Sequence, residues 1–194
     1  SHDRAYQYDA IGNRMEARIG VTAITGAPNY SANALNQYTS VPSVASGPSY
    51  DDDGNATSYP LPVAPTTNST LVWDAENRLI SAAVNGTTTT YLYDAQTRRI
   101  ATTTGNVTTL FVYDGWNCVA KYVGVTVAET YTWGEDLSGS MQGAGGVGGL
   151  LAVKSGSTVR YPTFDGNGNV SEYLDSRGTT VAHFEYDPCG NTDI

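Results

Sequence analysis

Hydrophobic and aromatic residues recur at every second position in several short segments of the chain. Thr89, Tyr91 and Tyr93 would share one face of an extended backbone, and the segments 109–113 and 182–186 repeat this pattern with aromatic residues two positions apart. A period of two is typical of β-strands, and it places the aromatic side chains of neighbouring strands on the same face of a sheet. The pattern therefore predicts short antiparallel strands and almost no helix.

A second regularity is an aromatic residue followed by Asp, repeated with a period of about twenty residues. Asp74, Asp94 and Asp114 each follow Trp or Tyr at this spacing. Trp133-Gly134 continues the series without the acid, and Ala32-Asn33 begins a degenerate copy with Asn in place of Asp. Repeats of this length are typical of arrays in which each unit packs only against its neighbours.

Each Asp of the repeat is expected to form a turn. Its carboxylate can accept hydrogen bonds from backbone N–H groups just ahead of it, and the Gly or Asn that follows tolerates a positive φ. Asn85-Gly86 is a strong hairpin signal at the other end of a unit, and weaker signals follow at 105–106, 156–157 and 177–178. The predicted structural turn residues are Asp9, Asp51, Asp74, Asp94, Asp114, Asp165 and Asp187.

These signals predict an all-β fold in which residues 1–194 form one array of tandem β-hairpins. The sheet is expected to coil into part of a spiral or shell, because strands twist. A Pro- and Thr-rich stretch at 56–70 is predicted as a surface loop, and the Gly-rich stretch 134–149 as a flexible loop. Neither separates domains, since the repeat resumes beyond each. Unpaired sheet edges should favour self-association.

Composition and charge narrow the possible partners. The chain is 40% hydrophobic and has 21 Gly, which fits an all-β fold rather than a disordered chain. Its net charge of −9 disfavours nucleic acid and anionic membrane surfaces. No apolar run is long enough to insert into a membrane. Cys118 and Cys189 are too few for a disulfide framework or a zinc site, and whether they form a single bridge stays open.

Candidate catalytic and metal-binding motifs favour a structural interpretation. The Gly-rich segment 143–148 fits G-x-G-x-x-G but lacks the strand before it and the helix after it that a dinucleotide site needs. The segments Asp51–Asn55 and Asp165–Asn169 carry oxygen ligands at alternate positions, so weak calcium binding stays a minority hypothesis. His2 and His183 have no evident nucleophile partner. A glycosidase pair among the turn aspartates stays formally open. We predict no cofactor, no metal and no catalytic residue.

Exposed aromatic residues are the most plausible ligand-binding groups. Trp73, Trp116 and Trp133 could stack on the apolar faces of sugar rings. Packing of these rings between strands is the favoured interpretation, because the pattern recurs with or without a ligand.

The repeated units resemble the YD repeats of bacterial Rhs-type proteins, which also occur in toxin-complex C proteins and in teneurins. The resemblance covers nearly the whole chain, and the stretch from Tyr131-Thr132-Trp133-Gly134 to Leu150 resembles the approach to the Rhs-associated core. It implies a spiral sheet that closes into a hollow shell, which in many members encloses a C-terminal toxin and releases it after self-cleavage. Asp187-Pro188 resembles the cleavage motif only superficially, because it occupies a repeat turn.

The resemblance implies a structural role: a non-catalytic segment of a secreted or surface-exposed bacterial shell that encloses or displays another module. The chain stops at Ile194, before the tyrosine-rich plug and the cleavage region. We therefore expect a fragment of a longer Rhs chain or a unit that assembles edge to edge. The alternative is an extracellular carbohydrate-binding or adhesion module, and an enzyme is the least supported hypothesis.

Overall fold

A computed structural model describes residues 4–19, 30–42, 47–61, 64–186, 190 and 192. Within these ranges the chain forms seventeen β-strands and no helix, which confirms the predicted all-β class. Accordingly, no helix in this part of the chain could cross a membrane. The contacts divide the chain into two compact units, Ser1–Tyr91 and Leu92–Ile194, which are described separately.

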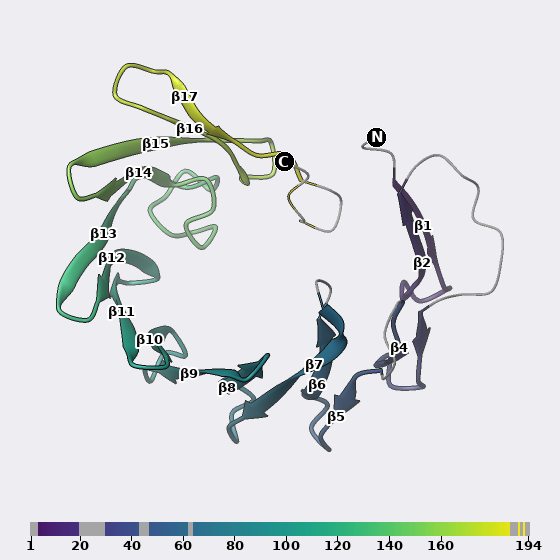
Figure 1. Ribbon diagram of the computed structural model, residues 1–194. Helices are drawn as coiled ribbons and strands as arrows, with labels where there is room; N and C mark the ends of the chain where they lie inside the picture. Colours follow the sequence, from purple (N-terminus) through teal and green to yellow (C-terminus); the bar gives the residue numbers. More distant parts are fainter. Residues whose placement is uncertain are drawn as a thin grey trace. The chain divides into compact units, whose positions relative to one another are not determined.

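The first unit contains two small sheets and the beginning of a large one (Figure 1). β1 pairs with β2 and β3 with β4, while β5 to β9 are neighbours in chain order, all antiparallel. The strands are β1 (Arg4–Tyr8), β2 (Arg14–Ile19), β3 (Ser31–Ala32), β4 (Tyr38–Ser40), β5 (Ser49–Tyr50), β6 (Ala56–Leu61), β7 (Ala64–Trp73), β8 (Leu79–Val84) and β9 (Thr87–Tyr93).

The second unit continues the same meander, so that β5 to β17 follow chain order in one thirteen-stranded sheet. Each strand of the unit is antiparallel to the next. The strands are β10 (Arg99–Thr104), β11 (Val107–Asp114), β12 (Asn117–Val123), β13 (Thr126–Trp133), β14 (Leu150–Ser155), β15 (Thr158–Phe164), β16 (Val170–Leu174) and β17 (Thr180–His183).

A β-bulge recurs one step before the repeat turn. In the β7–β8 pair, Val72 lies opposite Ser81 but Trp73 lies opposite Leu79, so the outgoing strand holds one extra residue. Such a bulge increases the local right-handed twist, so each copy adds to the coiling of the sheet within its unit. Further copies of the shift occur at Val112/Tyr113, Thr132/Trp133 and Thr163/Phe164.

Short hairpins close the opposite ends of the strands. Asn85 and Gly86 have φ values of 50° and 77°, as a type I′ turn requires. Gly105, Gly124 and Gly156 have φ of 57° to 58° as the first central residue of their turns, the pattern of a type II′ turn. The four hairpins use the turn types whose twist matches that of the flanking strands.

The predicted surface loop at 56–70 is wrong, because this segment forms β6 and most of β7. Pro60 pairs with Asn68 of β7 inside the strand. On its other side, β5 is only two residues long and pairs with Ala56 and Ser58, so Pro60 lies beyond its end. On the β5 side the missing proline N–H therefore interrupts no ladder hydrogen bond, and a strand without a neighbour on that side tolerates the residue.

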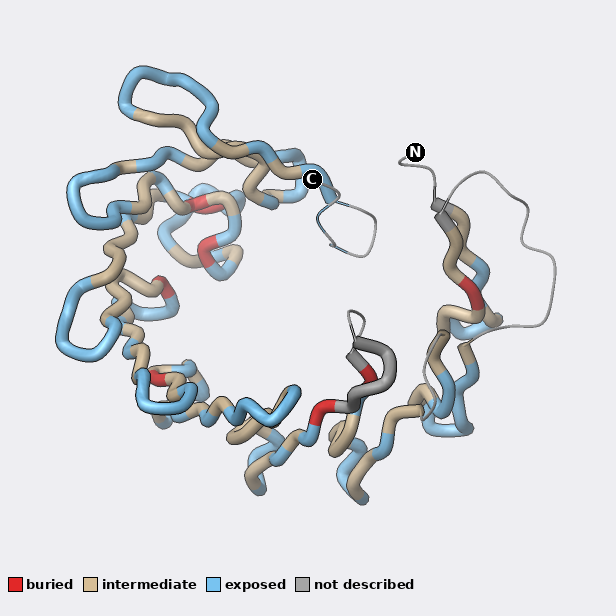
Figure 2. Tube along the Cα trace, in the orientation of Figure 1, coloured by how far each residue is buried: buried red, intermediate tan, exposed pale blue. Residues whose placement is uncertain are grey.

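The sheet forms a single layer with almost no enclosed core (Figure 2). Among the described residues, Ala101 is the one buried hydrophobic side chain, at 3% exposure. Most strand residues are half-buried, and in strands such as β9 half-buried and exposed residues alternate. Stability therefore comes chiefly from contacts between neighbouring strands, as in other repeat arrays.

Candidate functional site

The repeat turns are five-residue loops organised by their first side chain. The carboxylate Oδ1 of Asp74 accepts hydrogen bonds from the N–H groups of Glu76 at 2.9 Å and Arg78 at 3.0 Å. Its Oδ2 accepts a third bond from the Arg78 guanidinium at 2.8 Å. The same arrangement is present in the turns that begin at Asp9, Asp51, Asp94 and Asp165.

These bonds stabilise the charged form of the carboxylates. The Asn13 side-chain amide is the main cause that holds the pKa of Asp9 below its usual value. The Asn169 amide acts in the same way on the pKa of Asp165. Hydrogen bonds to the ionised carboxylate lower its pKa, so the turns are built around charged aspartates.

One predicted turn residue, Asp114, is placed differently, and another lies outside the described residues. Asp114 is the last residue of β11 and pairs with Asn117, leaving Gly115 and Trp116 as a two-residue turn. Gly115, directly after the Asp, has a φ of 57°, which allows this tighter turn. Asp187 lies outside the described residues, as do Cys189 and His2.

The turn that joins β16 to β17 lies at the hairpin end of the strands, where the sequence analysis placed Arg177-Gly178, but it has the hydrogen bonds of a repeat turn. The Oδ1 atom of Asp175 accepts hydrogen bonds from the N–H groups of Arg177 and Thr179, at 2.8 and 2.9 Å. Leu174 precedes this Asp where other repeats have an aromatic residue. The spacing Asp-x-x-Gly alone would have identified the turn.

The two calcium hypotheses gain no support from the turn geometry. Both carboxylate oxygens of Asp165 face donors of their own turn, including the amide of Asn169 at 2.9 Å. The same holds for Asp51 and the amide of Asn55. Within the described ranges, no group of three or more His, Cys, Asp or Glu residues could hold a metal ion. His183 lies on β17 between Glu172 and Glu185.

Neighbouring turns are linked side by side through their last two residues. The Asn13 amide donates to Oδ1 of Asn36 at 3.3 Å, and the Asn55 amide donates to Oδ1 of Asn77 at 2.7 Å. In each case the acceptor is the fourth residue of the next turn, with a φ of 61° in Asn36 and 58° in Asn77. Asn at this position thus tolerates the left-handed backbone, and its side-chain oxygen also accepts a hydrogen bond from the neighbouring turn.

Two substitutions separate these roles of Asn77. Asn77→Gly keeps the left-handed backbone accessible but removes the acceptor, and should lower the free energy of unfolding by about 0.5 kcal/mol. Asn77→Ala also disfavours the left-handed backbone, and should lower it by about 1–2 kcal/mol. Urea unfolding monitored by circular dichroism measures both values. A greater loss for Gly than for Ala would contradict the assignment.

The Tyr or Trp before several of the turns donates a hydrogen bond across the sheet. The indole N–H of Trp133 donates to the carbonyl of Cys118 at 2.7 Å, and the hydroxyl of Tyr113 donates to the carbonyl of Arg99 at 3.0 Å. The acceptor lies just after the preceding repeat's turn, and both Tyr and Trp can donate such a bond. Phe164, which precedes the turn at Asp165, has no donor. Equivalent bonds are Tyr50 to Tyr38, Trp73 to Ala56 and Tyr186 to Val170.

The three candidate tryptophans differ in their exposure and in their hydrogen bonds. Trp73 and Trp133 are half-buried, and their indole N–H groups are bonded to backbone carbonyls. Trp116 lies at the tip of the β11–β12 turn with 60% of its side chain exposed. Trp116 is therefore the most exposed of the three rings.

The Gly-rich segment 134–149 is a folded loop, whereas the sequence analysis predicted a flexible one. Asp136 lies at its centre with 6% exposure. Its Oδ1 accepts bonds from the N–H and hydroxyl of Ser138, at 2.9 and 2.5 Å. Its Oδ2 accepts bonds from the N–H groups of Ala144 at 2.7 Å and Gly146 at 3.0 Å. The Ser138 hydroxyl is the main cause that lowers the pKa of Asp136 to about 2.

The loop also packs against the β11–β12 hairpin. The side-chain amide of Gln142 accepts a bond from the N–H of Trp116 and donates one to the carbonyl of Asp114, both at 3.0 Å. Gly146 approaches so closely that a Cβ there would lie 2.7 Å from Oδ1 of Asn117 and 3.2 Å from the ring of Trp133. β14 follows the loop in place of a helix, so the geometry of a dinucleotide site is absent here.

Register places one continuous row of side chains on a single face of the second unit. Phe111 pairs with Lys121, which pairs with Glu129. Two residues beyond Glu129, Tyr131 pairs with Val153, which pairs with Arg160. We call this side the aromatic face, and define it by Arg99, Phe111, Tyr113, Cys118, Lys121, Glu129, Tyr131, Trp133, Val153, Arg160, Pro162, Phe164, Tyr173, Ala182 and Phe184.

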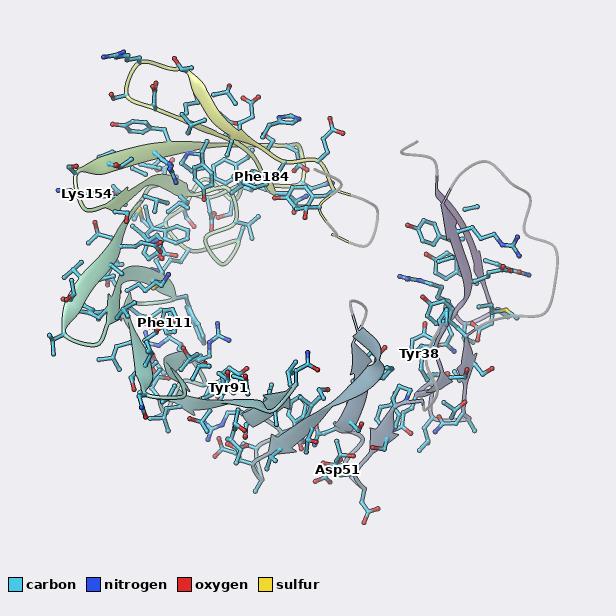
Figure 3. The ribbon with its side chains drawn as sticks, in the orientation of Figure 1. Tyr38, Asp51, Tyr91, Phe111, Lys154 and Phe184 are labelled. Carbon is cyan, nitrogen blue, oxygen red and sulfur yellow. The ribbon has the colours of Figure 1, made fainter. Side chains whose placement is uncertain are left out.

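Lys154 marks the face of the sheet opposite the aromatic face. Lys154 pairs with Thr130 and so points away from Tyr131. In Figure 3, Phe111 lies on the inner side of the curved second unit and Lys154 on its outer side. The two labelled residues thus mark the two faces of one sheet.

A hydrogen-bonded trio lies at the middle of the aromatic face. Lys121 Nζ lies 3.3 Å from Oε2 of Glu129, and the Tyr131 hydroxyl donates to the same oxygen. The Tyr131 bond is the main cause that lowers the pKa of Glu129, while burial raises the pKa of Tyr131. Burial also raises the pKa of the Cys118 thiol. The trio satisfies its own charges, and nothing in it resembles an activated nucleophile.

The sequence of the repeats was compared with models of known protein families. Residues 73–109 match the family model described as RHS Repeat. This segment contains an RHS repeat. The resemblance to the Rhs/YD-repeat family is thereby confirmed, and the matched RHS segment begins at Trp73 and runs through β8, β9 and β10 into β11.

Solved structures similar to the RHS repeat chain belong to much larger proteins. Two of them are described as TcdB2-TccC3-Cdc42 and TcdB2-TccC3-TEV, with 11% and 12% identity and TM-scores of 0.41 and 0.36. Each likeness covers 98% of this chain and 17% of that one. Among curated proteins, none matches the sequence.

Proposed function

We propose that this RHS repeat chain is a non-catalytic structural scaffold, a wall segment that encloses or displays another polypeptide module outside the bacterial cell. The observation that carries the proposal is the single-layer sheet. A sheet normally buries at least one face against a second layer. Here the loop 134–149 lies against Trp133, but no second layer covers the rest of the aromatic face within the described residues, and its rings are only half-buried.

A half-covered aromatic face of this size favours a partner polypeptide. Large contiguous apolar surfaces on soluble proteins usually mark interaction sites. The turns and cross-sheet hydrogen bonds hold the face in place without a ligand, as a wall requires. The same bonds occupy the Asp and Tyr groups that catalysis would use, so they support a structural role over an enzymatic one.

Site-specific photocrosslinking tests the proposal in the complete open reading frame that contains this chain. A crosslinking residue at Tyr131 reports on the aromatic face, and one at Lys154 is the matched control on the other face. We expect Tyr131 to crosslink to a polypeptide segment outside residues 1–194 and Lys154 not to do so. Equal crosslinking at both positions, or none at Tyr131, would contradict the proposal.

We also propose that the chain self-associates through the edges of its sheet. β17 ends the strand order of the sheet and, among the described residues, has a paired strand on one side only, β16. An uncovered edge offers backbone donors and acceptors to a second copy. Light scattering coupled to size exclusion should then show a mass that rises with concentration. A constant monomer mass up to high concentration would argue against assembly.

Carbohydrate binding remains the alternative, and the exposed ring of Trp116 is the observation that favours it. An exposed indole can stack on a sugar face. Binding to a glycan array that is lost on Trp116→Ala would support this alternative over the scaffold.

A further inference from the structure

Charged residues are unevenly distributed over the second unit. Residues 92–194 contain six Lys and Arg against eleven Asp and Glu, a net charge of −5. On the aromatic face the balance is reversed, because Arg99, Lys121 and Arg160 are accompanied by Glu129. Arg98 lies over the ring of Tyr113 at the edge of this face, but Asp94 pairs with it at 2.7 Å and balances its charge. A basic surface on an otherwise acidic protein attracts negatively charged partners to that surface.

The two arginines are more exposed than the lysine. Lys121 is engaged by Glu129 at 3.3 Å, so this pair contributes little net charge. Arg99 and Arg160 are both exposed. The guanidinium of Arg99 lies 5.6 Å from the centre of the Phe111 ring, which holds it at the aromatic surface. Arg160 pairs with Val153, next to Tyr131 in the register.

The row between the arginines is apolar except for the Lys121–Glu129 pair. Phe111, Tyr131 and Val153 stand between Arg99 and Arg160 in the register of β11 to β15. An arginine fork binds carboxylates in a bidentate geometry, and an aromatic surface binds apolar side chains. A ligand that matches both must combine carboxylates with apolar groups along one chain.

We propose that the aromatic face of the second unit binds an acidic polypeptide segment, with Arg99 and Arg160 pairing to its carboxylates and the row between them contacting its apolar side chains. This inference rests on the proposed scaffold function and names the chemistry of the bound module. Nucleic acid fits less well, because the net charge of −9 repels a phosphate backbone at longer range.

Two synthetic peptides of equal length test the charge requirement with the full 194-residue chain. One alternates Glu with Leu and Val, and the other has Lys in place of each Glu. Fluorescence anisotropy should show binding of the acidic peptide, with an affinity that falls as salt is raised, and at least tenfold weaker binding of the basic peptide. Equal binding of both peptides would overturn the inference. Tighter binding of heparin or DNA than of the acidic peptide would also overturn it.

Variants locate the binding on the aromatic face. The double variant Arg99→Gln/Arg160→Gln should weaken acidic-peptide binding at least tenfold. Lys154→Gln is the matched control, since it removes a positive charge from the opposite face. The affinity of this variant for the acidic peptide should stay within twofold of wild type. Arg99→Lys/Arg160→Lys keeps the charge and should retain most of the binding. Unchanged circular dichroism and melting would show that each variant folds.

The outcomes separate this inference from the scaffold proposal. If the double Gln variant binds the acidic peptide as wild type does, the charge assignment is wrong, while crosslinking from Tyr131 would still support a scaffold. If Tyr131 gives no crosslink, the scaffold proposal fails whatever the peptides do. Equal weakening by Lys154→Gln would show a nonspecific charge effect and overturn the site.

Discussion

Replacing Asp136 by Ala should release the loop 134–149 from the rest of the second unit. Four hydrogen bonds end on this carboxylate, two of them from the backbone N–H groups of Ala144 and Gly146. Removing a buried acceptor leaves its donors without partners, so these amides should exchange with solvent roughly ten- to hundredfold faster. Hydrogen–deuterium exchange measured by mass spectrometry reports this directly.

Glu135→Ala is the control, because it removes the same charge from the exposed neighbouring position. It should leave the exchange of the loop unchanged. Asp136→Asn keeps the size of the side chain but removes its charge and one acceptor, and should give an intermediate rate. Slow exchange in Asp136→Ala would show that the contacts of Gln142 and Asn117 hold the loop without the carboxylate.

The same bonds give the loop a pH dependence of known sign. The pKa of Asp136 falls from an ordinary 3.8 to about 2 in the folded chain. A carboxyl group with a depressed folded pKa contributes stability that is fully present above its unfolded pKa. Exchange in the loop should therefore be constant above about pH 5, after correction for intrinsic rates, and accelerate as the pH falls through 2.

The turns could be predicted from sequence because their chemistry is local. Asp74 and the donors that it accepts from lie within four residues of each other, so a short motif contains the whole interaction. Asp114 departs from its series because the following Gly115 allows a tighter turn, a competition that spacing alone does not reveal. Pro60 was misread because its tolerance depends on the length of a strand in another repeat, β5.

The remaining features depend on contacts that periodicity cannot reveal. Asp136 accepts bonds from residues two, eight and ten positions ahead, inside a Gly-rich segment without repeat signals. The aromatic residues were predicted to pack by stacking, but their N–H and O–H groups also select specific carbonyls. Asn117 is 2% exposed because the Gly-rich loop covers it, a contact across more than twenty residues.

Trp133→Ala should be the most destabilising single aromatic substitution in the second unit. The side chain donates to the carbonyl of Cys118 and contacts Gly146 of the loop, so its loss removes support from both. Truncation of a large side chain that is only half-buried should lower the free energy of unfolding by about 2–3 kcal/mol. Urea unfolding followed by circular dichroism gives this value.

Trp133→Phe separates the hydrogen bond from the packing. It keeps most of the ring and removes the indole donor, so the expected loss is about 1 kcal/mol. Trp116→Ala is the control, because its ring is 60% exposed and donates no bond to another strand. Its effect should stay within about 0.5 kcal/mol.

The order of the three variants tests the role of the aromatic residue in the repeat. If the hydrogen bond to the preceding repeat matters, Phe must be measurably worse than Trp at position 133. If Trp133→Phe is neutral and Trp116→Ala is destabilising, the rings act through general surface packing instead. In that case the cross-sheet donor would no longer explain why Tyr and Trp precede most of the turns.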